Sequence, residues 1–139
     1  MNYLLDTCVI SEVVKNNPNL NVINWLEKSP EDHLFLSVLT IGEIQKGISK
    51  LSDNNRKFFL QNWLQEDLLN RFTNRIIDID FEIVTQWGAL QGKAEAKGIQ
   101  IPTIDGLIGA TAVVHNLTII TRNVSDFEKT GAKIINLWL

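Results

Sequence analysis

Short apolar runs alternate with longer amphipathic segments along the whole chain. Five of the runs have the length and composition of buried strands, at residues 3–5, 34–38, 76–79, 118–121 and 133–137. Between them, apolar residues recur at helical spacing. Strands that alternate with helices in this way indicate an α/β fold. We expect one domain over residues 1–139, with a mainly parallel five-stranded sheet flanked by helices.

Capping residues suggest where the helices of the first half begin. Ser11 fits the N-cap of a short helix after the first strand. Thr40 fits the N-cap of a later helix, with Glu43 as its capping-box partner. A polar turn at Asp53-Asn54-Asn55 then separates two amphipathic helices. We expect these two helices to form a hairpin over residues 40–72 that stands beside the sheet.

Two more helices are predicted in the second half. One covers residues 81–97, with Gly98 as its C′ residue, and the other begins at Pro102-Thr103. Ile104 and Val113 are expected to face the core from this last helix. Its small residues would let it lie close to the sheet, and they are Gly106, Gly109, Ala110 and Ala112. We expect Gly106 to leave open space beside Asp105.

The formal net charge is −3, which argues against an overall basic nucleic-acid binder. The charge is uneven, however, because the stretch from Lys46 to Arg75 holds six basic and three acidic residues. That excess fits a phosphate-binding surface, and it fits a pair of solvated helix faces equally well.

The chain has one cysteine, Cys8, so no disulfide can form within it. A reducing cytoplasm is the expected setting. No apolar run approaches the roughly 20 residues that a membrane span requires. The first residues lack the basic region of a secretory signal. We therefore expect no membrane partner.

Four carboxylates follow strands or begin helices: Asp6, Glu43, Asp105 and Asp126. Open parallel sheets bind ligands outside the carboxyl ends of their strands, so these acids are expected to converge there. Each has a structural alternative. Asp6 could make an Asx-turn or cap a helix, Glu43 could complete a capping box, and Asp105 could interact with a helix dipole.

Carboxylates without a nearby histidine or thiol favour a hard cation, Mg²⁺ or Mn²⁺. His33 and His115 lack a spacing suited to zinc. Such an ion activates water and neutralises phosphodiester charge, which is nuclease chemistry.

Four segments together resemble the PIN domain, and more narrowly the VapC-type toxins of bacterial toxin–antitoxin pairs. They are Asp6-Thr7, residues 40–48 (TIGEIQKGI), residues 102–112 (PTIDGLIGATA) and residues 121–131 (TRNVSDFEKTG). The resemblance runs from the first strand to the last. It implies a Rossmann-like three-layer fold with a protruding helical hairpin, and a metal-dependent ribonuclease.

The resemblance also implies roles for individual residues. Asp6 and Asp105 would be the principal ligands of a Mg²⁺ or Mn²⁺ ion, and Glu43 the third acid. Many relatives carry an acid where this chain has Asn123, so the fourth ligand is either Asn123 or Asp126. Thr121 would orient a ligand or water.

Cys8 stands where the family commonly has Asn or Ser. A thiol is a poor Mg²⁺ ligand, so Cys8 is expected to pack without binding metal. Relatives form homodimers and are inhibited by a cognate antitoxin, which we expect against the hairpin over residues 40–72.

Three other classes of protein share part of this pattern. A haloacid-dehalogenase-type phosphatase needs an acid at position 8, and a receiver domain needs paired acids before its first helix; the chain has neither. A PIN-like RNA-binding or protein-interaction module without catalysis is favoured only by Asn123. Loss of catalysis would also be expected to erode Asp6, Glu43 or Asp105, and all three are present.

Overall fold

The computed structural model describes all residues, 1–139, and its five strands form one sheet in the order β3-β2-β1-β4-β5. The strands are β1 (Tyr3–Leu5), β2 (Leu34–Ser37), β3 (Ile76–Ile77), β4 (Thr118–Ile120) and β5 (Lys133–Ile135). Every neighbouring pair is parallel, and Leu4 of β1 pairs with Phe35 of β2 and Ile119 of β4. The predicted α/β fold with a parallel five-stranded sheet is confirmed.

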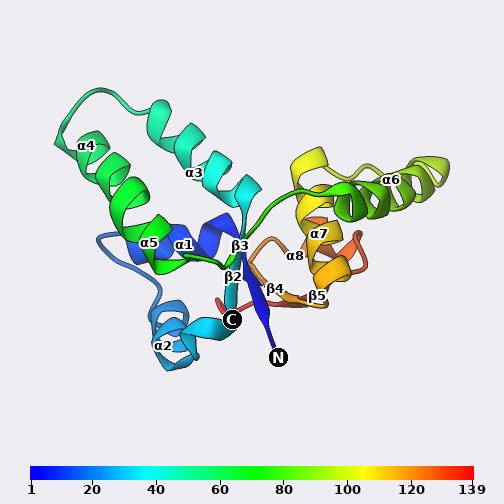
Figure 1. Ribbon diagram of the computed structural model, residues 1–139, viewed down its shortest axis with the longest axis horizontal. Helices are drawn as coiled ribbons and strands as arrows, with labels where there is room; N and C mark the ends of the chain where they lie inside the picture. The colour runs from blue at the N-terminus through cyan, green and yellow to red at the C-terminus, as the bar shows by residue number, and fades with distance from the viewer.

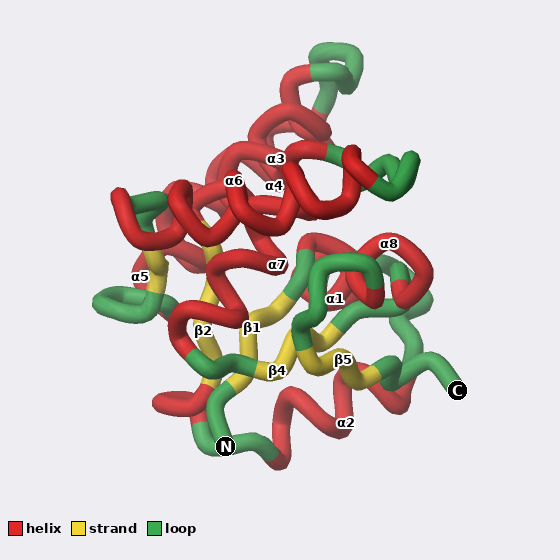
Figure 2. Tube along the Cα trace, turned by 90° about the vertical axis from the view of Figure 1, so that its right-hand side faces the viewer, coloured by secondary structure: helices red, strands yellow, loops and turns green.

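Helices cover both faces of the sheet, which gives three layers (Figures 1 and 2). One face carries α1 (Thr7–Val13), α2 (Leu20–Lys28) and α3 (Val38–Ser49); the other carries α7 (Thr103–His115) and α8 (Val124–Glu128). Successive strand residues point to opposite faces. Leu5 and Ile120 therefore pack in one core cluster, while Leu4 and Ile119 pack in another with Ile108 of α7. None of the helices combines the length and apolarity that a bilayer-spanning segment needs.

The strand order reverses at the centre of the sheet, between β1 and β4. The chain leaves β1 into α1 on one face, whereas α7 and α8, which flank β4, lie on the other face. A parallel sheet opens a crevice at such a point, outside the carboxyl ends of its strands. Asp6 follows β1 and Thr121 follows β4, so both residues lie at this crevice.

The predicted helical hairpin is present and projects beyond the sheet (Figure 1). It consists of α3, α4 (Asn55–Asn62), a π-helical segment η2 (Trp63–Leu68) and α5 (Leu69–Arg71). Asn54 caps α4, because its side chain accepts a hydrogen bond of 3.0 Å from the Lys57 N–H. Leu64 and Leu68 are buried in the core at the base of the hairpin.

Two predicted helix starts are wrong. Helix α1 begins at Thr7, so Ser11 lies inside it and Asp6 holds the N-cap position. Helix α3 begins at Val38, where the Ser37 hydroxyl accepts a hydrogen bond of 3.1 Å from the Leu39 N–H. Both helices begin directly at the end of a strand. The predicted caps stand further along the chain because they assume a loop between strand and helix, and the fold has none there.

Helix α6 (Phe81–Ala96) ends as expected, with Gly98 in the left-handed region at φ 71°. In α7, Ile104 and Val113 do not face the core as predicted, since they are 39% and 40% exposed. Gly106 does not leave open space either. A Cβ at this position would lie 3.1 Å from the Trp87 ring. The small residue therefore serves the close approach of α6 to α7.

Candidate active site

Asp6 lies at the carboxyl end of the central strand, where its own N–H donates a hydrogen bond of 3.0 Å to the Ile120 carbonyl. The residue is buried, and its carboxylate makes no capping bond to α1. Instead, Oδ2 accepts a hydrogen bond of 2.8 Å from the Thr121 hydroxyl. The capping alternative for Asp6 is therefore not realised.

Thr121 connects the ends of β1 and β4. Its hydroxyl is fully buried, donates to Asp6 and accepts a hydrogen bond of 2.9 Å from the Asn123 N–H. The Cys8 sulfur lies 3.7 Å from Asp6 Oδ2 and 3.6 Å from Thr121 Oγ1. Burial, and then the charge of Asp6, raise the pKa of the Cys8 thiol. Cys8 thus stays a neutral thiol that packs beside Asp6.

Glu43 lies on α3 and accepts a hydrogen bond of 2.6 Å from the Thr7 hydroxyl. This contact joins the hairpin to the residue that follows Asp6. The predicted capping box between Thr40 and Glu43 is wrong, because Ser37 caps the helix and Thr40 lies within it. The Glu43 carboxylate is thereby available at the crevice.

Asp105 lies in the first turn of α7, and its pKa is raised to about 6. Burial is the main cause, followed by the negative charges of Asp6, Asp126 and Glu43. The effect of one charge on another weakens with distance, so the three acids that act on Asp105 lie near it. The four acids, which come from four separate segments, therefore share one electrostatic environment.

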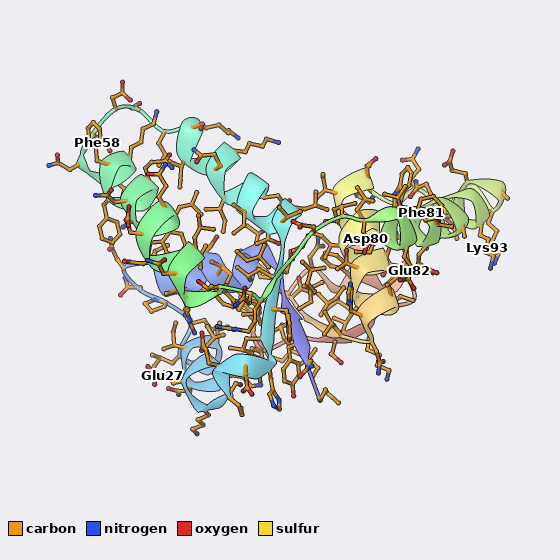
Figure 3. The ribbon with its side chains drawn as sticks, in the orientation of Figure 1. Glu27, Phe58, Asp80, Phe81, Glu82 and Lys93 are labelled. Carbon is orange, nitrogen blue, oxygen red and sulfur yellow. The ribbon has the colours of Figure 1, made fainter.

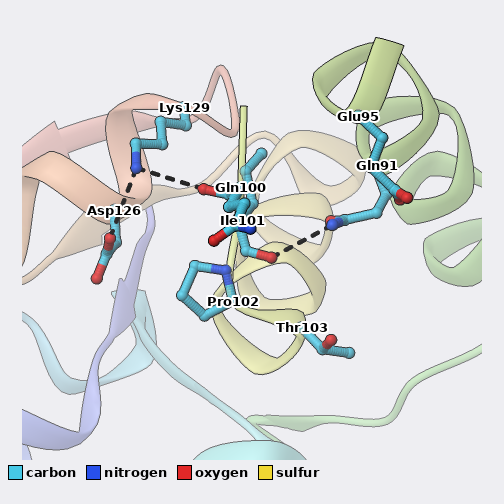
Figure 4. A pocket seen from close by; sticks show the side chains of 8 residues that line it. All are labelled: Gln91, Glu95, Gln100, Ile101, Pro102, Thr103, Asp126 and Lys129. Carbon is cyan, nitrogen blue, oxygen red and sulfur yellow. Dashed lines mark hydrogen bonds and ion pairs between the residues drawn. The ribbon is translucent and has the colours of Figure 1, made fainter. Parts of the chain in front are cut away.

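Asp126 lines a polar cavity of about 600 Å³ (Figure 4). Lys129 lies 4.0 Å from the Asp126 carboxylate and donates a hydrogen bond of 3.3 Å to the Gln100 carbonyl. The carboxylate of Asp126 thus has one cationic neighbour. Asn123 holds the N-cap position of α8, but its side chain makes no capping bond.

The donor set of this site suits a hard divalent cation. The candidate ligands are four carboxylates and the Asn123 amide, all with oxygen donors, and the repulsion among the carboxylates at Asp105 is the kind that a bound cation relieves. No three acidic, histidine or cysteine side chains stand close enough to hold one ion together. Mg²⁺ requires less, because it commonly binds through one or two carboxylates, several waters and substrate phosphate.

Two residues that were not predicted as site residues contact the candidate acids. Thr7 positions Glu43, and Lys129 pairs with Asp126. Thr7 belongs to the Asp6-Thr7 segment that resembles the PIN domain, and its place next to Asp6 was a signal that it lies at the site. The i,i+3 spacing of Asp126 and Lys129 was a signal for their pairing at α8.

Known proteins match this chain over almost its whole length. The family model described as PIN domain matches residues 3–133. The VapC ribonuclease Y4jK of Sinorhizobium fredii is 34% identical over 135 residues, covering 97% of this chain and 96% of its own. Toxin FitB of Neisseria gonorrhoeae is 33% identical over 135 residues, covering 97% of each chain.

The same similarity extends to three dimensions. A chain in the crystal structure of FitAcB from Neisseria gonorrhoeae superposes with a TM-score of 0.92 at 32% identity, covering 98% of each chain.

Proposed function

The chain belongs to the PIN-domain family, and we propose that it is a metal-dependent ribonuclease that acts as the toxin of a toxin–antitoxin pair. Relatives named as a VapC ribonuclease and as toxin FitB support this function. We further propose that residues 1–139 act as a single catalytic domain, with Mg²⁺ or Mn²⁺ as the ion and the cytoplasm as the setting.

One observation supports catalysis most strongly. The pKa of Asp105 is raised to about 6 by burial and by the charges of three other acids. Uncompensated carboxylates at a sheet crevice destabilise a fold, and perturbed pKa values cluster at functional sites. An interaction module without catalysis has no use for this arrangement.

Each side chain then has a role. Asp6 and Asp105 are the principal metal ligands in this proposal, and Glu43 is the third acid. The Thr121 hydroxyl fixes the Asp6 carboxylate, and the Thr7 hydroxyl fixes Glu43. A bound Mg²⁺ or Mn²⁺ would supply Lewis-acid neutralisation of phosphate charge and a water of lowered pKa.

Asp126 is the better candidate for the fourth position. It carries a negative charge that acts on Asp105 and raises the pKa of that residue, whereas the Asn123 amide is neutral. We therefore expect Asp126→Asn to reduce cleavage by at least about tenfold, since one ligating oxygen loses its charge. Asn123→Ala should have a smaller effect. The reverse order would assign the position to Asn123.

The partners follow from the same family relationship. RNA is the proposed substrate, a homodimer is the proposed assembly, and an antitoxin is the proposed inhibitor. The solved FitAcB and FitAB structures support an antitoxin partner. We place it against the hairpin over residues 40–72, where α1, α3 and α4 line a groove of about 360 Å³ that is partly apolar.

Induced expression in a bacterial host tests the toxin function. The wild-type chain should arrest growth, and Asp105→Asn should not, although the variant accumulates as folded protein. Asp78→Asn is a matched control, because Asp78 is exposed and its charge is not among those that raise the pKa of Asp105. Growth arrest that persists in Asp105→Asn would point to the alternative, an RNA-binding or protein-interaction module without catalysis.

A further inference from the structure

The basic residues of the hairpin region fall into two groups in the structure. Four of the six between Lys46 and Arg75 are engaged by the protein itself. Arg56 donates to the Val14 carbonyl, Lys57 pairs with Asp53, and both Arg71 and Arg75 pair with Glu31; the distances are 2.6, 3.2, 2.6 and 3.6 Å. These contacts hold the four side chains against the protein, and Asp53 and Glu31 neutralise two of the four charges.

Lys46 and Lys50 form the second group. Both are exposed, and neither ammonium has a hydrogen-bond acceptor or an ion-pair partner in the protein. They lie one helical turn apart near the end of α3, separated by about 6 Å along its axis. Lys46 and Lys50 are therefore the basic side chains of this region that are free to contact a ligand, and they form one short strip.

This strip borders the acidic site. Lys46 and Lys50 line a groove of about 730 Å³ that also contains Thr7 and Glu43. The opposite wall includes Ile104 from the first turn of α7, next to Asp105. A polymer lying in the groove would therefore pass from Glu43 to the two lysines.

We propose that this groove binds the sugar–phosphate backbone of single-stranded RNA beside the scissile bond, with Lys46 and Lys50 contacting consecutive phosphates. The proposal rests on the ribonuclease function proposed above. Positively charged grooves track the backbone of single strands in this way. The spacing of one helical turn presents the charges in a row, as a phosphate backbone does.

The uncharged residues of the groove fit the same ligand. Gly42 and Gly47 line it, and a Cβ at either position would meet no atom within 4 Å, so the surface of α3 is open there. Val38 and Ile104 are 37% and 39% exposed and offer apolar contact to sugar or base. Exposure of Ile104 at the start of α7 is thereby explained.

A role at the helix end is the competing explanation. Cations near a helix C-terminus interact favourably with its dipole, and Lys46 and Lys50 occupy the last turn and the C-cap of α3. Helix α6 provides a matched control, because Lys93 and Lys97 occupy the same two positions there. Lys93 lies far along α6, away from the hairpin (Figure 3).

The test measures binding of a fluorescent single-stranded RNA oligonucleotide of mixed sequence by anisotropy, with Mg²⁺, over a series of KCl concentrations. Every protein carries Asp105→Asn so that the RNA is not cut. Lys46→Ala/Lys50→Ala should raise Kd about tenfold and reduce the salt slope by about 1.4, for two lost phosphate contacts. Lys93→Ala/Lys97→Ala should change neither by more than about a tenth of that effect.

One further double variant and one further probe separate the possible explanations. Lys46→Arg/Lys50→Arg should retain the parent salt slope, which separates charge from folding. Equal losses in the two alanine pairs, an unchanged slope in Lys46→Ala/Lys50→Ala, or no RNA binding by the parent would overturn the proposal. If Lys46→Ala/Lys50→Ala weakens binding of poly-L-glutamate but leaves RNA binding intact, the groove binds an acidic polypeptide. That result would also overturn the proposal.

If the wild-type chain fails to cut RNA while the lysine effect is observed, the groove still binds RNA and only the proposed catalysis fails.

Discussion

Replacing Asp105 by asparagine should make the metal-free protein more stable while it abolishes the proposed activity. In the folded chain the pKa of Asp105 is about 6, whereas the ordinary value is 3.8. Between these values the folded state binds more protons than the unfolded state, so stability falls as pH rises through this window. Above about pH 7 the wild-type protein bears the full cost of the ionised carboxylate. The neutral amide of the Asp105→Asn variant would bear none.

The size of the effect can be worked out. The difference from 3.8 to about 6 corresponds to roughly 3 kcal/mol at about 1.4 kcal/mol per pKa unit. Asp105 is partly exposed, and solvent screening reduces this value to about half. Asparagine also loses a favourable charge at the first turn of α7, about 0.3–1 kcal/mol. The net gain is therefore about 1 kcal/mol, or about 3–5 °C in Tm.

Urea unfolding in EDTA measures the effect directly, with wild type, Asp105→Asn and the exposed control Asp78→Asn. The gain for Asp105→Asn should be present near about pH 8 and should disappear near about pH 3, below both the folded and the unfolded pKa of Asp105. Asp78→Asn should show no such pH dependence. If Asp105→Asn is equally stable or less stable at the higher pH, the four carboxylates do not share one environment.

Other predictions concern packing and the support of the site. Gly109→Ala should destabilise the protein by about 1–3 kcal/mol in urea unfolding, because its Cβ would lie 2.4 Å from Thr130; an unchanged midpoint would refute this close packing. Thr121→Val should reduce RNA cleavage about 10–100-fold through loss of the hydrogen bond to Asp6, with Thr121→Ser as the control that retains it. Equal activity of the two Thr121 variants would remove its positioning role.

The sequence predicted the strands and most helices correctly because their apolar periodicity is strong. Leu4 and Leu5 form part of a central strand, and Asn54 begins a helix, as expected. The errors in the predicted helix starts lie where a strand passes directly into a helix. Ser37 ends β2 and caps α3 at once, and no propensity rule separates it from Thr40 as the cap.

The candidate site was predictable only in part. Residues that follow parallel strands meet at one edge of the sheet, so the approach of Thr121 after β4 to Asp6 after β1 could be inferred from order alone. Contacts across the fold could not be. The 2.6 Å bond from Thr7 to Glu43 and the approach of Trp87 to Gly106 depend on how separate helices pack. Periodicity carries no information on such pairings.

Cleavage of total cellular RNA by the purified protein tests the account most directly. The assay compares Mg²⁺, Mn²⁺ and EDTA for the wild type, Asp6→Asn, Asp105→Asn and the control Asp78→Asn. The account predicts discrete fragments from the wild type and the control, and none in EDTA or in either of the other variants. Cleavage that survives EDTA, or that persists in both Asp6→Asn and Asp105→Asn, would contradict the carboxylate–metal ribonuclease.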